Sequence, residues 1–312
     1  ELFAFRDMPL PPGRLTTFDR TGQALTIRPF LNGPDVSPDD RSVAYDSGSG
    51  DSRDIYVLRI EGDGERATTN VERITGDATV EGYPEFSPDG LELIYERQRP
   101  DDKFFELWRV DLARPDDARM FYTEAGDLNN LIPLDWSVNG WMLTSRRDAD
   151  FLASDLIAVS TTDNEPTVVE IAATVYEERL AEVSPNGNWV AYDSNQPGQF
   201  GVFVQPFPDD TVGSRLQVTA DGFAPRWSAD GTEIYFLTLD GQITAAPITD
   251  LGSELQSDAP VELFRAWIAG TGFNHMYAVT SDGRFLVNVT AVDENQPPIR
   301  VIQNSPVFEG RE

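Results

Sequence analysis

One short phrase recurs six times along this chain of 312 residues. It consists of a hydrophobic residue, a Ser or Thr, a tight turn that ends in Gly or Asp, and a run of alternating apolar residues. The copies are Val36-Ser37-Pro38-Asp39-Asp40, Phe86-Ser87-Pro88-Asp89-Gly90, Trp136-Ser137-Val138-Asn139-Gly140, Val183-Ser184-Pro185-Asn186-Gly187, Trp227-Ser228-Ala229-Asp230-Gly231 and Val279-Thr280-Ser281-Asp282-Gly283. The Ser or Thr residues follow one another at steps of 50, 50, 47, 44 and 52, the length of a four-stranded propeller blade. The sequence therefore predicts an all-β, six-bladed β-propeller with four-stranded antiparallel blades.

The spacing of the repeats also predicts the domain boundaries. We expect a single propeller domain over residues 1–312, with blades that begin near residues 33, 83, 133, 180, 224 and 276. Residues 14–28 alternate apolar and polar residues around a turn, which is typical of a β-hairpin. The last repeat ends with a third strand at Ile299 to Gln303, so we expect one strand of this N-terminal hairpin to close the ring. Residues 1–13 form an edge or linker in this scheme, and a seventh blade that begins in this region is the alternative.

Acidic residues dominate the composition. The chain has 53 Asp plus Glu against 24 Lys plus Arg, which gives a formal net charge of −29. Such a chain repels nucleic acid and anionic membrane surfaces, whereas it attracts cations and basic partners. No stretch approaches the roughly 18 consecutive apolar residues that a membrane-spanning helix needs. We therefore expect this segment to bind no nucleic acid and to insert into no membrane.

The repeated phrase resembles that of the TolB-type, WD40-like (PD40) β-propeller family. The segment from Tyr83 to Gly90 matches its pattern of an aromatic residue followed by Ser-Pro-Asp-Gly, and Asp54-Ile55-Tyr56-Val57 matches its later Ile-Tyr-Val segment. The segments from Trp189 to Ser194 and from Val202 to Pro208 are similar to the C-terminal propellers of bacterial serine/threonine-kinase-type sensor proteins. The resemblance implies an extracellular or periplasmic bacterial module that senses or binds a partner.

The sequence offers no motif for nucleophilic catalysis. It contains no Cys and a single His, His275, and it lacks the Gly-x-Ser-x-Gly elbow of many hydrolases. Turn formation explains the Ser residues of the repeated phrase, because Asp or Asn followed by Gly is typical of a tight turn between two strands. We predict no catalytic residue.

Charged residues precede the hydrophobic residue of the phrase in five of the six copies. They are Asp35, Glu85, Asp135, Glu182 and Arg226, and Ala278 takes the sixth position. Side chains alternate along a strand, so these residues are expected to face the central channel while their hydrophobic neighbours pack between blades. Four carboxylates that converge on a narrow channel raise one another's pKa or recruit a cation. Ca²⁺, which takes about six to eight oxygen ligands, is the candidate cofactor at Asp35, Glu85, Asp135 and Glu182; a water-filled channel in which Arg226 pairs with a carboxylate is the alternative.

The loops that enter the innermost strands supply a second set of candidates. These loops are expected to surround one mouth of the channel and to form its ligand-binding face. The candidate residues there are Glu81, Asn130, Glu177, Glu178 and His275.

Three functions from different classes fit these features. The first is a non-catalytic extracytoplasmic propeller that binds a protein, peptide or small ligand at its channel mouth, as part of a larger sensor or envelope protein. The second is a subunit of an extracellular assembly or filament, a homo-oligomer built through its terminal segments, since incomplete blades invite strand exchange. The third is a carbohydrate-active enzyme that uses paired carboxylates of the channel.

Overall fold

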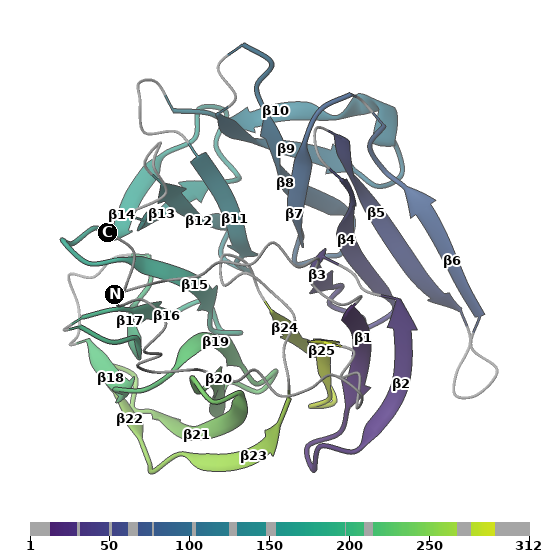
Figure 1. Ribbon diagram of the computed structural model, residues 1–312. Helices are drawn as coiled ribbons and strands as arrows, with labels where there is room; N and C mark the ends of the chain where they lie inside the picture. The colour runs from purple at the N-terminus through teal and green to yellow at the C-terminus, as the bar shows by residue number, and fades with distance from the viewer. Residues whose placement is uncertain are drawn as a thin grey trace, which may run out of the picture.

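The computed structural model describes residues 13–29, 32–49, 52–61, 68–76, 78–101, 104–124, 130–147, 154–196, 198–208, 215–266 and 276–290. Most of these residues lie in strands joined by turns and loops, and they include one turn of 3-10 helix, η2(Pro115–Asp117). The sheets are antiparallel and stand radially around a common centre (Figure 1). The predicted all-β propeller architecture is confirmed.

The strands follow one another outward from the centre within each sheet. One sheet contains β3(Asn32–Val36), β4(Ser42–Ser49), β5(Ser52–Glu61) and β6(Thr68–Arg73). An eight-stranded sheet contains β7(Glu81–Phe86), β8(Glu92–Gln98), β9(Phe105–Asp111), β10(Arg119–Tyr122), β11(Asn130–Trp136), β12(Trp141–Arg147), β13(Ser154–Ser160) and β14(Val168–Ala172). The next sheet contains β15(Glu178–Val183), β16(Trp189–Ser194), β17(Gly201–Pro206) and β18(Leu216–Thr219). A five-stranded sheet contains β19(Phe223–Trp227), β20(Glu233–Leu237), β21(Gln242–Asp250), β22(Leu255–Ser257) and β23(Val261–Arg265). The last contains β24(Tyr277–Val279), β25(Phe285–Thr290), β1(Gly13–Phe18) and β2(Ala24–Pro29).

The eight-stranded sheet is made of two similar groups, β7–β10 and β11–β14. Each group has the same antiparallel order as the four-stranded sheets. The groups are joined by one parallel pair, Asn130 with Phe105. Each group therefore corresponds to one sequence repeat.

The N-terminal hairpin completes the last sheet. β25 pairs with β24 on one edge and with β1 on the other, from Thr290 opposite Gly13 to Phe285 opposite Phe18. β2 then forms the outer strand. The structure differs here from the expectation of one closing strand: both hairpin strands join the sheet, because β1 takes the third position that we assigned to residues 299–303, which lie outside the described part. The number of blades, six with seven as the alternative, stays a prediction.

Hydrophobic clusters lie between successive groups of strands. Each of six clusters in the described residues combines side chains of at least two neighbouring groups, and each includes or contacts the hydrophobic residue of one copy of the phrase: Val36, Phe86, Trp136, Val183, Trp227 or Val279. The cluster that contains Leu15 and Ala278 of the last sheet also contains Val43 and Tyr45 of the sheet that begins with β3. The packing between sheets therefore runs in a closed circle.

The repeated phrase forms the turn that was expected of it. In the turn after β7, the Ser87 hydroxyl donates to Asp89 Oδ1 at 2.6 Å, and Gly90 has the positive φ of 71° that a glycine adopts without strain. In the turn after β3, Asp40 takes the same left-handed conformation, with φ 57°. Turn formation accounts for these Ser and Asp residues without a catalytic role.

Candidate functional site: the axial cavity

We call the residue directly before the hydrophobic residue of the phrase the axial residue. In the inner strands a β-bulge precedes this position. The pairing of inner and second strand slips between Gly82 and Glu85, and at the corresponding places in β3, β11, β15 and β19. Residues with a left-handed backbone lie two positions before the axial residue in four of these strands: Gly33, Tyr83, Leu180 and Ala224. A bulge turns the following side chains, so the axial side chain faces the centre while the next residue packs between sheets.

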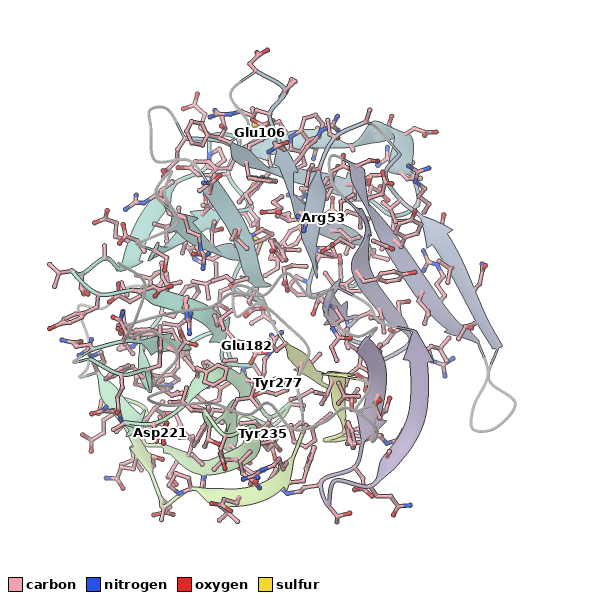
Figure 2. The ribbon with its side chains drawn as sticks, in the orientation of Figure 1. Arg53, Glu106, Glu182, Asp221, Tyr235 and Tyr277 are labelled. Carbon is pink, nitrogen blue, oxygen red and sulfur yellow. The ribbon has the colours of Figure 1, made fainter. Side chains whose placement is uncertain are left out.

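The axial side chains line a cavity of about 290 Å³. Asp35, Asp135, Glu182, Arg226 and Ala278 all contribute to its wall. Its rim is made of the turns that follow the inner strands, through Pro38, Pro88, Val138, Pro185 and Ala229. Figure 2 shows Glu182 near the centre of the ring. The cavity therefore connects the charged axis with the face of the ring that carries the repeated turns.

Three axial carboxylates link neighbouring sheets. Asp35 Oδ2 accepts the backbone N–H of Phe86 at 2.8 Å, and Asp135 Oδ2 accepts that of Val183 at 2.7 Å. Glu182 Oε2 accepts the N–H of Trp227 at 2.5 Å. In each case the donor is the hydrophobic residue of the next copy of the phrase. These acids thus satisfy backbone groups at the inter-sheet contact while they also face the cavity.

Arg226 extends the same pattern with the opposite charge. Its Nε donates to the carbonyl oxygen of Tyr277 in the next sheet at 3.2 Å, and its Nη1 lies 3.4 Å from Glu182 Oε1. Arg226 is only 5% exposed, and Nη2 has no hydrogen-bond partner among the residues that the structure describes. A buried donor in this state is normally satisfied by water or by a ligand.

Burial raises the pKa of three axial acids, Asp35, Glu85 and Asp135. It raises the pKa of Asp35 to about 6, against the opposing effects of the Phe86 N–H and Arg226. Burial and the charge of Glu182 raise the pKa of Asp135 to about 8. The pKa of Glu85 lies well above its usual 4.5, because the side chain is buried and close to Asp35. Burial therefore favours the protonated forms of Glu85 and Asp135, whereas the raised pKa of Arg226 keeps that side chain charged.

The described structure shows no metal-binding arrangement of the axial acids, and the calcium site stays a prediction. No group of three or more His, Cys, Asp or Glu side chains within the described ranges is placed to hold a metal ion. The reason is visible in the contacts of Asp35, Asp135 and Glu182, whose oxygens accept backbone N–H groups of the next sheet. Burial also raises the pKa of Glu85 and of Asp135, and calcium needs ionised carboxylates.

The predicted mouth residues are mostly buried at the other end of the inner strands. Glu81 and Glu178 are fully buried, and Asn130 is 3% exposed. Glu178 accepts the Thr174 hydroxyl at 2.5 Å, and Glu81 accepts the Thr79 hydroxyl at 3.0 Å. These contacts order the loops that enter β7 and β15, and they remove the three residues from a ligand-binding surface.

Two predicted mouth residues remain. Glu177 is partly exposed, and its carboxylate lies 3.7 Å from Arg179. His275 lies outside the described residues. The only described cavity that contains the axial residues is thus rimmed by the repeated turns instead of by these loops.

Two further acids, in the second strands, bind the bulges in a way that the sequence analysis did not predict. Asp46 Oδ1 accepts the N–H of Tyr83, and Asp193 Oδ2 accepts that of Ala224; both donors have the left-handed backbone of the bulge. Arg53 and Arg179 pair with these carboxylates at 3.4 and 3.0 Å. A sequence feature that could have identified these two acids is the tetrapeptide Ala-Tyr-Asp-Ser, which occurs twice and ends at residues 47 and 194.

Solved structures share this architecture. A putative TolB from Agrobacterium tumefaciens matches at 16% sequence identity with a TM-score of 0.65, over 89% of this chain and 98% of that one. TolB from Acinetobacter baumannii matches at 13% identity with a TM-score of 0.57, over 81% of this chain and 66% of that one. This chain has the fold of the TolB β-propellers. The predicted TolB-type resemblance is thereby confirmed for the fold.

The propeller fold also occurs in an enzyme among the matches. An oligogalacturonate lyase in complex with manganese matches at 14% identity with a TM-score of 0.54, over 83% of this chain and 77% of that one. At identities this low the similarity concerns the fold alone. No protein-family model and no curated protein matches the chain. None of the helices in the described ranges has the length and apolar character to cross a membrane.

Proposed function

We propose that this chain is a non-catalytic, six-bladed β-propeller that binds a protein or peptide partner at the axial cavity, on the face that carries the repeated turns. One observation carries the proposal: the buried guanidinium of Arg226 lines this cavity with Nη2 unpartnered in the described structure. A backbone carbonyl or carboxylate of a partner would satisfy that donor. Small and apolar rim residues, among them the 59% exposed Val138, add a surface for a peptide chain.

The non-catalytic part of the proposal rests on the hydrogen bonds of the axial acids. A glycosidase-type mechanism requires two carboxyl groups that both approach the substrate. Asp35, Asp135 and Glu182 instead each commit an oxygen to the backbone of the next sheet. We therefore favour a binding role over the carbohydrate-active enzyme that the sequence left open.

The cellular setting is part of the same proposal. We propose that the domain works outside the cytoplasm of a bacterium, as part of a larger sensor or envelope protein. The resemblance of residues 189–194 and 202–208 to the propellers of kinase-type sensor proteins supports this setting. A net charge of −29 without any cysteine is compatible with it.

A peptide library displayed on phage tests the proposal directly. Peptides selected on the immobilised protein are synthesised with a fluorophore, and their affinities are measured by fluorescence anisotropy. The rim variant V138R is expected to weaken binding by about tenfold or more, because a bulky cation then blocks the cavity entrance.

The matched control is V175R. Val175 is 94% exposed and precedes β15 at the opposite end of the inner strands, so the same substitution there should leave affinity unchanged. Loss of binding in V175R but not in V138R would contradict the proposal, and so would a library that yields no binder.

A further inference from the structure

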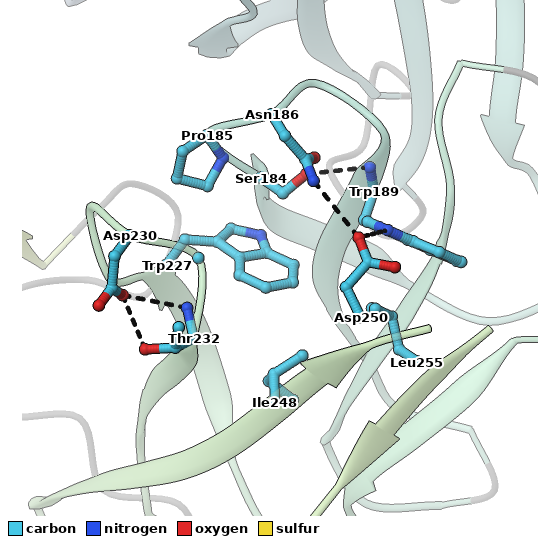
Figure 3. A pocket seen from close by; sticks show the side chains of 11 residues that line it. Ser184, Pro185, Asn186, Trp189, Trp227, Asp230, Thr232, Ile248, Asp250 and Leu255 are labelled. Carbon is cyan, nitrogen blue, oxygen red and sulfur yellow. Dashed lines mark hydrogen bonds between the residues drawn. The ribbon is translucent and has the colours of Figure 1, made fainter. Parts of the chain in front are cut away.

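A second cavity lies between the β15–β18 sheet and the β19–β23 sheet. Its volume is about 360 Å³, and Figure 3 shows two indole rings, of Trp189 and Trp227, in its wall. Ile248 and Leu255 complete the apolar part, and Asp230 and Asp250 supply carboxylates. No Lys or Arg belongs to the residues that line it. The cavity therefore combines aromatic faces with negative charge.

The corresponding place between β7–β10 and β11–β14 is filled by an arginine of the chain itself. The Arg109 guanidinium lies 4.9 Å from the ring centre of Trp136. Its Nε donates to Glu92 at 3.1 Å, and its Nη1 donates to the carbonyl oxygen of Thr161 at 3.1 Å. A cation is thus held between an indole ring, a carboxylate and a carbonyl group.

Strand register establishes that the two places correspond. Trp136 pairs with Met142 as Trp227 pairs with Ile234, so the two tryptophans are equivalent. In the second strand, Trp189 takes the position of Glu92. In the third strand, Val204 takes the position of Arg109. After the third strand of the next group, Ile248 takes the position of Thr161. Replacement of Arg109 by the shorter Val204 leaves the place of the guanidinium open.

One other interface has a carboxylate at the position of Glu92, and it also pairs with an arginine. Glu233 of β20 corresponds to Glu92, and it forms an ion pair with Arg20 from the last sheet. Arg20 also lies 5.7 Å from the ring centre of Tyr235. In both places the carboxylate at this position pairs with a guanidinium that also lies over an aromatic ring.

The carboxylates of the open cavity suit a cationic occupant. Asp230 accepts three bonds, from the Ser228 hydroxyl and from the N–H and hydroxyl of Thr232, and all three go to Oδ1. The Ser228 bond is the first cause of a lowered pKa of Asp230, so this side chain is ionised at neutral pH. Asp250 is held in place by Trp189 Nε1 at 3.0 Å and by the Gly252 N–H at 2.7 Å. Both acids are thus fixed by bonds that leave oxygen lone pairs for a ligand.

We propose that the cavity between β15–β18 and β19–β23 binds the guanidinium of an arginine side chain from a protein or peptide partner. The indole faces of Trp189 and Trp227 hold the planar cation, and Asp230 and Asp250 neutralise it. This site is independent of the axial cavity, although Ser184, Pro185 and Trp227 border both cavities.

An NMR titration of the ¹⁵N-labelled protein tests this site without a known partner. The probes are N-acetyl-arginine amide and N-acetyl-citrulline amide, which have almost the same shape but differ in charge. The chain has six tryptophans, and only the indole N–H signals of Trp189 and Trp227 are expected to shift. The arginine probe should bind about tenfold more tightly than the citrulline probe, because only a cation gains from the rings and the carboxylates.

A pair of variants provides the matched control. D230N should weaken arginine binding by about threefold, while the turn is kept, since Asn186 naturally takes the same turn position and accepts the Ser184 hydroxyl. D89N makes the same change in the turn after β7, away from the cavity, and should leave binding unaltered. Equal affinity for the two probes, or shifts confined to Trp108, Trp136 and Trp141, would overturn the proposal whatever the phage selection at the axial cavity finds.

Discussion

At the scale of single residues, the axial side chains have two roles that a strand pattern does not separate. Asp35, Asp135 and Glu182 face the cavity and also accept a backbone N–H from the next sheet. Glu85 has the same place in its strand, and burial and its acidic neighbours raise its pKa well above the usual value. Folding therefore favours the protonated form of Glu85 relative to the unfolded chain.

The substitution E85Q should make the protein more stable, and increasingly so as pH rises. A carboxyl whose pKa is raised by folding stabilises the native state below its unfolded pKa, and this stability is lost as pH rises through the folded pKa. Wild-type stability should therefore fall as pH rises above the usual pKa of a glutamate. Gln cannot ionise, so E85Q should gain about 1–3 kcal/mol at pH 8, the usual cost of a poorly solvated polar group.

Urea unfolding at pH 5 and pH 8 measures this difference. The exposed Glu165 supplies the control, because E165Q should change the free energy of unfolding equally little at both pH values. If E85Q raised the free energy of unfolding more at pH 5 than at pH 8, the raised pKa of Glu85 would be contradicted.

At the scale of elements, the bulge in the inner strands explains how one strand serves both the axis and the inter-sheet contact. The bulge residue Ala224 has φ 52°, where an L-residue pays a steric cost. Its N–H is bonded to Asp193 at 2.9 Å, and its carbonyl accepts the Tyr277 hydroxyl at 2.9 Å. Neighbouring sheets therefore hold this conformation from both sides.

The variant A224G should be nearly neutral for stability. Relief of about 1–2 kcal/mol of steric cost offsets the added flexibility of glycine and the lost methyl group. Gly33 already occupies the same position in β3 with φ 53°. The matched variant A246G, at a fully buried site of regular strand in β21, should cost about 1.5 kcal/mol. Chemical denaturation of both variants checks this; equal destabilisation would show that the bulge stores no strain.

At the scale of the whole molecule, packing in a closed circle makes each sheet depend on two neighbours. The contact between the last sheet and the sheet that begins with β3 contains Leu15, Val43 and Tyr45. Leu15 belongs to the N-terminal strand that pairs with β25. The two ends of the described chain are thus joined through one buried cluster.

Truncation of this closing contact should destabilise the entire ring. Leu15 is 2% exposed, so L15A is expected to cost about 2–5 kcal/mol. Trp136, Trp141 and Trp189 report on groups of strands that do not adjoin the last sheet. The midpoints of urea unfolding measured by their fluorescence and by far-UV circular dichroism should both fall to the same lower urea concentration, because unfolding of a closed ring is cooperative.

The control for closure is L239A, at a residue that is 73% exposed. It should change stability by less than about 0.5 kcal/mol. If L15A lowered the circular dichroism signal alone and left the tryptophan transition in place, the last sheet would unfold independently and closure would not stabilise the ring.

Features that repeat along the chain could be predicted from the sequence. The Ser-Pro-Asp-Gly turns, the hydrophobic residue before each turn and the charged residue before that one recur at nearly constant spacing. Each depends on local physics, namely turn conformation and the alternation of side chains along a strand. The positions of Phe86 between sheets and of Asp135 at the axis therefore agree with the pattern.

Features that depend on neighbouring sheets could not be predicted. The sequence did not indicate that Glu81 and Glu178 are buried, because their partners Thr79 and Thr174 lie in loops without a regular pattern. It left calcium and a water-filled channel open at the axis, since it could not show that backbone N–H groups of the next sheet use the carboxylate oxygens. The sequence also did not show that Arg109 and Val204 take equivalent positions, because this equivalence follows from the strand register of two different interfaces.

The sequence by itself determined the repeat, the all-β radial architecture and the line of charges along the axis, because these follow from periodicities of two residues and of about 50 residues. Only the tertiary structure decided that both hairpin strands complete the last sheet, that the axial acids link neighbouring sheets, and that one interface is left open beside two tryptophans. Contacts between sheets join residues that are far apart in the sequence, and each depends on the size and charge of both partners.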